Sequence, residues 1–73
     1  MQDELKTIIA KFLKIDRDEI NNDTIIDSSV VQGSILFHRM ISRINGLYNI
    51  EIINYSSLKT YKDLISEIDS LMN

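Results

Sequence analysis

The sequence contains no cysteine, no proline and no tryptophan, and only two of its 73 residues are glycine. Without cysteine the chain has no disulfide scaffold, no thiolate zinc site and no cysteine nucleophile. The absence of proline and the scarcity of glycine exclude collagen-like repeats, proline-rich linkers and glycine-rich loops. The chain is therefore restricted to folds that depend on the packing of apolar side chains.

Long apolar runs are also missing, since none exceeds two or three residues, and we expect no membrane span. The first four residues lack the basic and apolar regions of a secretory signal, so we expect a cytoplasmic protein. The net charge of −3 and the isoelectric point near 4.9 argue against general affinity for nucleic acid or anionic lipid, because both require clustered positive charge.

Apolar residues make up 44% of the chain, and they include 14 isoleucines against one alanine. This share is too high for a disordered chain, and a chain of this length cannot build two hydrophobic cores. We therefore expect one domain, residues 1–73, that acts as a monomer.

Three segments have apolar residues at the spacing of an α-helix. The first covers residues 3–14. The second begins at Ser34, a preferred N-cap residue, and the third begins after Thr60, with Asp63 three residues later as in a capping box. Their apolar stripes are Leu5, Ile8, Ile9, Phe12 and Leu13, then Phe37, Met40, Ile41, Ile44 and Tyr48, then Tyr61, Leu64, Ile65, Ile68 and Leu71/Met72.

The segments between the helices are less regular. Residues 15–33 combine turn and cap chemistry with isolated apolar residues, which predicts a long loop pinned onto the core, with one short turn over residues 16–19. The second helix either ends at Asn45 or continues past Gly46. Residues 50–53 have a weak strand pattern without a partner, and residues 54–58 have room for one helical turn. The predicted fold is all-α, a small four-helix bundle of three main amphipathic helices and a short fourth.

Two groups of side chains are candidates for metal binding and for hydrolysis. Asp16, Asp18 and Glu19 resemble the opening of a calcium loop, but the loop's glycine and final glutamate are absent, so a solvated acidic turn is the better interpretation. Ser34 and His38 lie four residues apart on one helix, but no nucleophile elbow, oxyanion hole or orienting acid accompanies them. We expect no metal site and no catalytic residue, and therefore no enzyme.

A basic patch on the second helix, formed by His38, Arg39 and Arg43, is compatible with DNA binding. The negative charge of the whole chain and the small number of basic groups make that alternative weaker. The other interpretation is that Arg39 and Arg43 form a solvated face, paired with nearby acids such as Glu51.

Ser34 stands at the N-terminus of the second helix, immediately after Gly33. Ordinary helix capping is one explanation of this serine. The alternative is anion binding, because free backbone N–H groups and the helix dipole favour a phosphate at that end. Gly33 would leave room for a group attached to the serine.

Nearly the whole chain resembles the acyl carrier proteins, four-helix bundles that carry acyl groups on a 4′-phosphopantetheine arm. The resemblance rests on residue types and on their spacing around Ser34. The matching motifs are Leu5-Lys6-x-Ile8-Ile9, Leu13-x-Ile15, Asp16 to Ile20, Ile26, Val30, Ser34-Ile35, Tyr48-Asn49-Ile50-Glu51-Ile52 and Thr60-Tyr61-x-Asp63-Leu64.

The resemblance implies that Ser34 carries 4′-phosphopantetheine, transferred from coenzyme A by a phosphopantetheinyl transferase. Acyl- or aminoacyl-loading enzymes and synthases would be the other partners, in a fatty-acid, polyketide, peptide or cell-wall pathway. Ile35, His38, Arg39 and Arg43 would form the docking surface for these enzymes.

The sequence departs from the family in two places. Gly33 replaces the aspartate that precedes the modified serine, and the second helix, which is acidic in the family, carries Arg39 and Arg43. The first departure leaves open an alternative, a carrier-like interaction module that is never modified.

Overall fold

The computed structural model describes residues 2–27 and 33–72. This part of the chain contains three α-helices, α1 (Gln2–Leu13), α2 (Ser34–Tyr48) and α3 (Tyr61–Met72), and two 3-10 turns, η1 (Arg17–Glu19) and η2 (Tyr55–Ser57). No strand occurs within it, which confirms the predicted all-α class. Each helix in these ranges is too short or too polar to cross a membrane.

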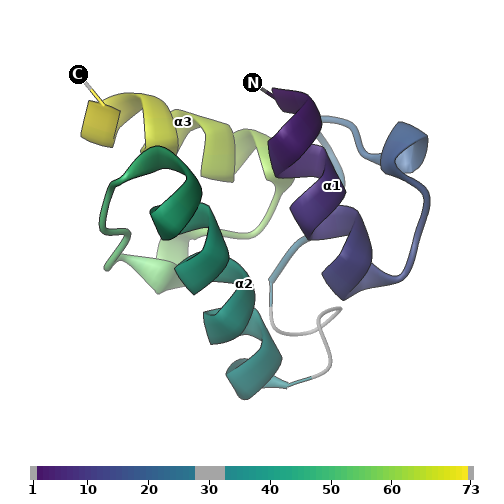
Figure 1. The fold of residues 1–73 in the computed structure, drawn as a ribbon, viewed down its shortest axis with the longest axis horizontal. Coiled ribbons are helices and arrows are strands. Elements are labelled where there is room, and N and C mark those ends of the chain that lie inside the picture. Colours follow the sequence, from purple (N-terminus) through teal and green to yellow (C-terminus); the bar gives the residue numbers. More distant parts are fainter. Residues whose placement is uncertain (1, 28–32, 73) are drawn as a thin grey trace.

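The helices α1 and α2 run in opposite directions and pack against each other, and α3 crosses the end at which α1 begins and α2 ends (Figure 1). Tyr61, the first residue of α3, lies below the Lys6 ammonium group of α1, 5.8 Å from nitrogen to ring centroid. Only 2% of Tyr61 is exposed, so its ring fills the space where α3 meets α1. Burial raises the pKa of the Tyr61 hydroxyl above its ordinary value, and the neighbouring Tyr48 and Asp3 add to the shift.

The three predicted apolar stripes supply most of the core. Burying one such aliphatic side chain contributes about 1.5–3 kcal/mol to stability. The residues at the margins of the stripes, such as Ile8, Phe12 and Ile65, are partly buried, and Leu71 is 43% exposed. The buried helical residues are Leu5, Ile9, Ala10, Phe37, Met40, Ile41, Ile44, Tyr61, Leu64 and Ile68.

The connection between α1 and α2 is pinned onto the core where the structure describes it. Ile20 and Ile26 are buried, as the isolated apolar residues of this segment predict. Backbone bonds then fix the connection to the start of α3: the Ile26 amide donates to the Lys59 carbonyl at 2.8 Å, and the Tyr61 amide donates to the Thr24 carbonyl at 2.8 Å. These bonds flank an isolated antiparallel bridge between Ile25 and Thr60. Ile25, another isolated apolar residue of this segment, is 44% exposed and does not serve as an anchor, and Val30 and Val31 lie outside the described residues.

The end of α1 differs by one residue from the prediction. The helix ends at Leu13, because Lys14 has a left-handed backbone with φ 59°. The Ile15 amide then donates to the Ala10 carbonyl at 3.2 Å, which is typical of a helix that ends in this conformation. After it η1 forms the predicted short turn, although the Asp16 side chain makes no capping hydrogen bond there.

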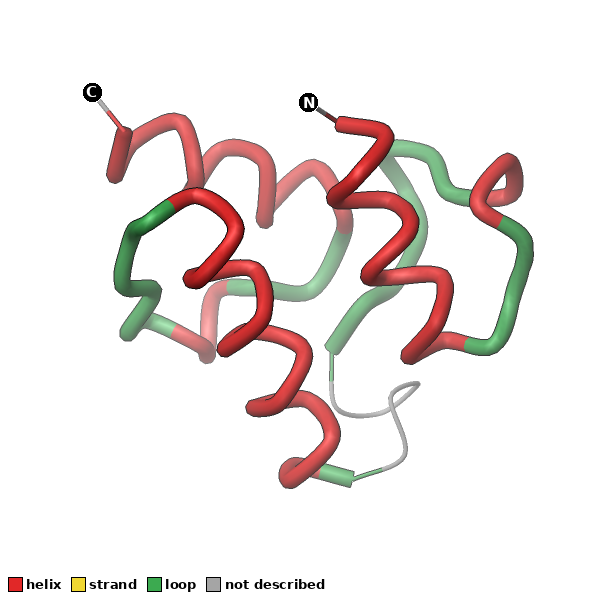
Figure 2. Tube along the Cα trace, in the orientation of Figure 1, coloured by secondary structure: helices red, strands yellow, loops and turns green. Residues whose placement is uncertain are grey.

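The short fourth helix of the predicted bundle is not confirmed. Its place is taken by η2, a single 3-10 turn (Figure 2). The Ser56 hydroxyl donates to the Asn54 side-chain oxygen and the Ser57 hydroxyl donates to the Asn54 carbonyl, each at 3.2 Å. Such local side-chain bonds compete with helical ones, so they favour a turn over a longer helix.

The helix α2 continues past Gly46 to Tyr48 and ends at Asn49, whose left-handed backbone has φ 55°. Asn45 organises the chain reversal that follows. Its carbonyl accepts from the amide of Ile50 at 3.0 Å, and its side-chain oxygen accepts from the amide of Ile52 at 3.0 Å. Ile52 is thereby held in the core, so residues 50–53 are fixed by this asparagine and not by strand pairing.

The predicted capping box at the start of α3 is confirmed. The Asp63 amide donates to the Thr60 hydroxyl at 3.2 Å, and the Thr60 amide donates to the Asp63 carboxylate at 3.1 Å.

We predict that Thr60→Ala lowers the free energy of unfolding by about 1 kcal/mol, because one orphan amide of α3 loses its partner. Urea unfolding followed by circular dichroism measures the change. Ser66→Ala, which removes an exposed hydroxyl from the same helix, should leave stability within about 0.5 kcal/mol of wild type.

The same box predicts a pH dependence. Hydrogen bonds from the Thr60 and Lys59 amides lower the pKa of the Asp63 carboxyl below its ordinary value of 3.8. A carboxyl with a depressed pKa stabilises the fold above its unfolded pKa, and this contribution is lost as the pH falls through the folded pKa. The stability difference between wild type and Asp63→Asn should therefore be largest near neutral pH and shrink in acid. A difference that stays constant down to acidic pH would contradict the assignment.

Candidate functional site

Ser34 is the first residue of α2, as the sequence predicts, but it is not the N-cap. That position belongs to Gly33, whose carbonyl accepts the first intrahelical hydrogen bond, from the Phe37 amide at 3.2 Å. The prediction of Ser34 as the cap was therefore wrong by one position. The side chain of Ser34 lies outside the described part of the structure, as do Ser28 and Ser29.

The backbone conformation at position 33 requires glycine. Its φ of 93° and ψ of 162° lie in a region that is essentially restricted to glycine. The sequence interpretation, that glycine leaves room for an attached group, receives no support from nearby atoms: a Cβ added at Gly33 would have no atom within 4 Å. The conformation of the turn into α2 therefore explains this residue better than crowding does.

The N-terminus of α2 retains free capacity for an anion. The amides of Ser34, Ile35 and Leu36 precede the first intrahelical bond and have no partner within α2. The cap residue is a glycine and offers no side-chain acceptor, and the first turn contains no acidic residue. The free backbone donors and the positive end of the helix dipole thus coincide at the N-terminus of α2. Both favour binding of a phosphate over binding of a cation.

The four residues predicted to dock partners, Ile35, His38, Arg39 and Arg43, are all exposed on α2. Ile35, Arg39 and Arg43 belong to the side of the helix opposite the buried Phe37, which is 5% exposed, whereas the ring of His38 lies 6.1 Å from the Phe37 ring. Ile35 is 74% exposed, an unusual position for an isoleucine. Their role in docking stays a prediction.

Nothing in the sequence indicates that Tyr55 lies beside the exposed residues of α2. The imidazole of His38 stacks on the Tyr55 ring with 4.8 Å between centroids, and the rings of Tyr55 and the buried Phe37 form a T-shaped pair with 6.1 Å between centroids. Because Tyr55 stands in a short turn far along the chain, no spacing pattern links it to α2. These contacts hold η2 against α2.

Neither arginine of α2 forms an ion pair with another residue in the ranges 2–27 and 33–72. The alternative that these side chains are neutralised by a nearby acid such as Glu51 therefore has no support in this part of the structure. The acidic side chains Asp16, Asp18 and Glu19 are exposed on and beside η1. Among the described residues no group of three potential ligands gathers around a metal position.

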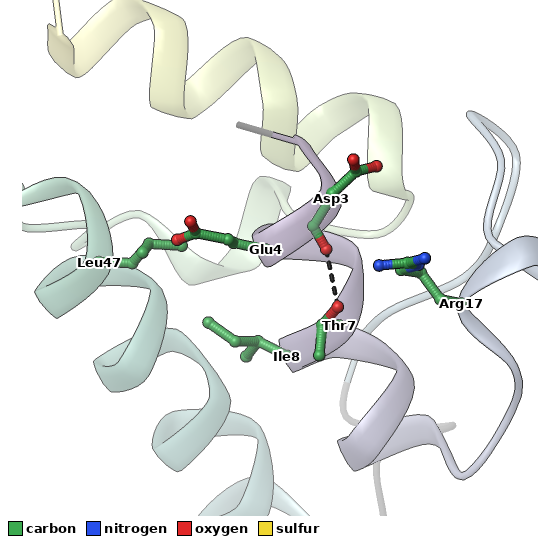
Figure 3. A pocket seen from close by; sticks show the side chains of 6 residues that line it. All are labelled: Asp3, Glu4, Thr7, Ile8, Arg17 and Leu47. Atoms are coloured by element: carbon green, nitrogen blue, oxygen red, sulfur yellow. Dashed lines mark hydrogen bonds between the residues drawn. The ribbon is translucent and has the colours of Figure 1, made fainter.

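A shallow pocket of about 280 Å³ lies between α1, η1 and the last turn of α2, which is the opposite end of α2 from Ser34 (Figure 3). Ile8 and Leu47 give it apolar walls, while Glu4 extends toward Leu47 and Arg17 extends from η1 toward α1. Burial, with a smaller effect of the Glu4 carboxylate, raises the pKa of Tyr48 at the end of α2. The remaining lining residues are Asp3 and Thr7.

The chain matches no protein-family model, and no curated protein is significantly similar to it. The resemblance to acyl carrier proteins therefore depends on the residues quoted above and on their spacing.

The two glycines allow a direct test of the turn into α2. We predict that Gly33→Ala lowers the free energy of unfolding by about 1–3 kcal/mol, because alanine is strained at this φ and ψ. Gly46→Ala is the matched control: this glycine is inside α2 with open space around it, so the change should raise stability by about 1 kcal/mol. Urea unfolding measures both. Equal effects of the two substitutions would contradict the backbone assigned to Gly33.

Proposed function

We propose that this protein is an acyl or aminoacyl carrier protein, in which Ser34 holds a 4′-phosphopantetheine arm. The observation that carries the proposal is the position of Ser34 as the first residue of a 15-residue helix whose N-terminus has no acidic side chain and no side-chain cap. On this proposal the three α-helices together with η2 correspond to the four-helix bundle of the family.

The residues at the start of α2 fit the phosphate of such an arm. The amides of Ile35 and Leu36 lack partners within the helix, and the α2 dipole stabilises negative charge at Ser34. The arm would supply a terminal thiol that holds the acyl group as a thioester. The protein's own contribution is to position the attachment point at one end of a packed helix, and it carries out no reaction itself.

The partners follow from this role. A phosphopantetheinyl transferase would join the Ser34 oxygen to the phosphorus of coenzyme A that bears the pantetheine, with adenosine 3′,5′-bisphosphate as the leaving group and the hydroxyl proton passing to a base. Loading enzymes and synthases would then use the carrier in the cytoplasm. The pathway is left open, because the chain contains nothing that selects a fatty-acid, polyketide, peptide or cell-wall product.

A second candidate, an unmodified carrier-like interaction module, is favoured by one observation. Gly33 stands where the family has aspartate, and its backbone conformation excludes a return to that residue without strain. The two candidates differ in whether Ser34 is modified, so one mass measurement separates them.

We predict that incubation with coenzyme A and a broad-specificity phosphopantetheinyl transferase adds one phosphopantetheine to the protein, detected by intact-mass spectrometry. Ser34→Ala should abolish the addition, because the accepting oxygen is lost. Ser42→Ala is the matched control, since it removes an exposed hydroxyl from the middle of the same helix, and it should be modified at the wild-type rate.

Tandem mass spectrometry then locates the modified residue. Modification at Ser28, Ser29 or any other hydroxyl would contradict the assignment of Ser34. No mass increase, under conditions in which a known carrier protein is fully modified, would favour the interaction module.

A further inference from the structure

Asn45 and Gly46 form the only asparagine–glycine pair in the sequence, and the pair lies near the C-terminal end of α2. In such a pair the main-chain nitrogen of glycine can attack the side-chain carbonyl carbon of asparagine, because no Cβ hinders its approach. Asparagine is a thermolabile residue through this reaction. A Cβ added at Gly46 would have no atom within 4 Å, so no neighbouring element crowds the pair. The pair is therefore a candidate site of covalent modification.

The folded structure restrains Asn45 in two ways. Its side-chain oxygen accepts a hydrogen bond from the Ile52 amide at 3.0 Å, which fixes the side-chain torsions. Its carbonyl accepts from the amides of Asn49 and Ile50, the latter at 3.0 Å, which fixes the main chain at the end of the helix. Ring closure onto Gly46 requires both parts of Asn45 to rotate. The reaction is therefore blocked while the end of α2 is intact.

The C-terminal end of α2 has features of a segment that opens locally. Glycine is among the least favourable residues in a helix, and Gly46 is exposed. Ile53, in the turn that follows the helix, is 74% exposed, whereas Ile52 is fully buried and fastens this turn to the core. Opening of one helix end costs less free energy than unfolding of the whole protein. Release of Ile52 alone would thus free Asn45 to react.

We propose that Asn45 is a deamidation site whose reaction is controlled by local opening of residues 45–53. The Gly46 nitrogen bonds to the side-chain carbonyl carbon of Asn45, loses its proton and expels ammonia, which leaves a cyclic imide. Water then opens the imide. Attack at the former side-chain carbon yields aspartate, and attack at the main-chain carbon yields isoaspartate, in which the chain continues through the side chain. The inference is independent of the proposed function, because Ser34 takes no part in it.

The two products affect the turn differently. Aspartate keeps the main-chain carbonyl and a side-chain oxygen, so it can still accept from the amides of Ile50 and Ile52. Isoaspartate inserts a methylene group into the main chain and displaces the carbonyl that ends α2. The turn then loses both acceptors, and Ile52 is no longer held in the core. Formation of isoaspartate is thus a one-way change that leaves the turn open.

Peptide mapping by tandem mass spectrometry measures deamidation at each asparagine while the protein is incubated at mildly alkaline pH. We expect Asn45 to react at least about tenfold more slowly in the folded protein than in guanidinium chloride. Methylation by an isoaspartyl methyltransferase with S-adenosylmethionine identifies isoaspartate among the products. Equal rates in the two states, or no modification of Asn45 after prolonged incubation of the folded protein, would overturn the proposal.

Two substitutions of buried isoleucines separate local opening from unfolding of the whole protein. Ile52 and Ile9 are both 0% exposed, but only Ile52 belongs to the turn. Ile52→Val should speed deamidation about two- to tenfold, because a smaller buried side chain holds the turn less well. Ile9→Val is the matched control in α1 and should change the rate by less than about twofold. Equal acceleration by both would show that the reaction requires global unfolding and would contradict control by the turn.

Asn45→Asp separates the charge of the products from the altered main chain. The isoaspartate form is isolated from the incubated protein by reversed-phase chromatography, and hydrogen exchange of the Ile50 and Ile52 amides is followed by nuclear magnetic resonance. We expect exchange at least about tenfold faster than in wild type for the isoaspartate form, and within about threefold of wild type for Asn45→Asp. Exchange at the wild-type rate in the isoaspartate form would overturn the inference that this modification opens the turn.

Discussion

Two backbone hydrogen bonds, from Ile26 to Lys59 and from Tyr61 to Thr24, hold the long connection against the start of α3, and the other parts of the fold depend on this pairing. The pairing brings Ile26 into the core beside residues from all three helices. It also ends at the residue that caps α3, because Thr60 takes part both in the bridge and in the capping box. One short stretch therefore joins the first half of the chain to the last and starts the last helix.

The helices could be predicted from the sequence because their signals are local. Apolar residues repeat with the period of a helix in three segments, and Thr60 with Asp63 marks the start of α3 through side-chain chemistry that acts over three residues. The bridge could not be predicted, since it is a single residue pair, Ile25 with Thr60, between positions far apart in the chain. The short helix expected after α2 does not form, because hydrogen bonds from the Ser56 and Ser57 hydroxyls to Asn54 stabilise a turn instead.

The candidate site was predictable in its residues and less so in its geometry. The start of α2 at Ser34 follows from the apolar stripe, but the cap at Gly33 depends on a backbone conformation that no periodicity reveals. The exposure of Arg39 and Arg43 follows from helical phase, whereas the stacking of Tyr55 on His38 requires the path of the chain after α2. In consequence α2 has two separate exposed features, an N-terminus without a side-chain cap and an exposed side that carries Arg39 and Arg43.

The buried face of α3 has a consequence for how the chain folds as it is synthesised. Tyr61, Leu64 and Ile68 complete the core, and Leu58 enters it just before the helix begins. Until these residues have left the ribosome, the apolar stripes of α1 and α2 have nothing to close against on that side. The emerging chain must therefore leave part of these apolar stripes exposed to solvent until α3 has been made, and exposed apolar surface of this kind makes a partly folded chain prone to aggregation.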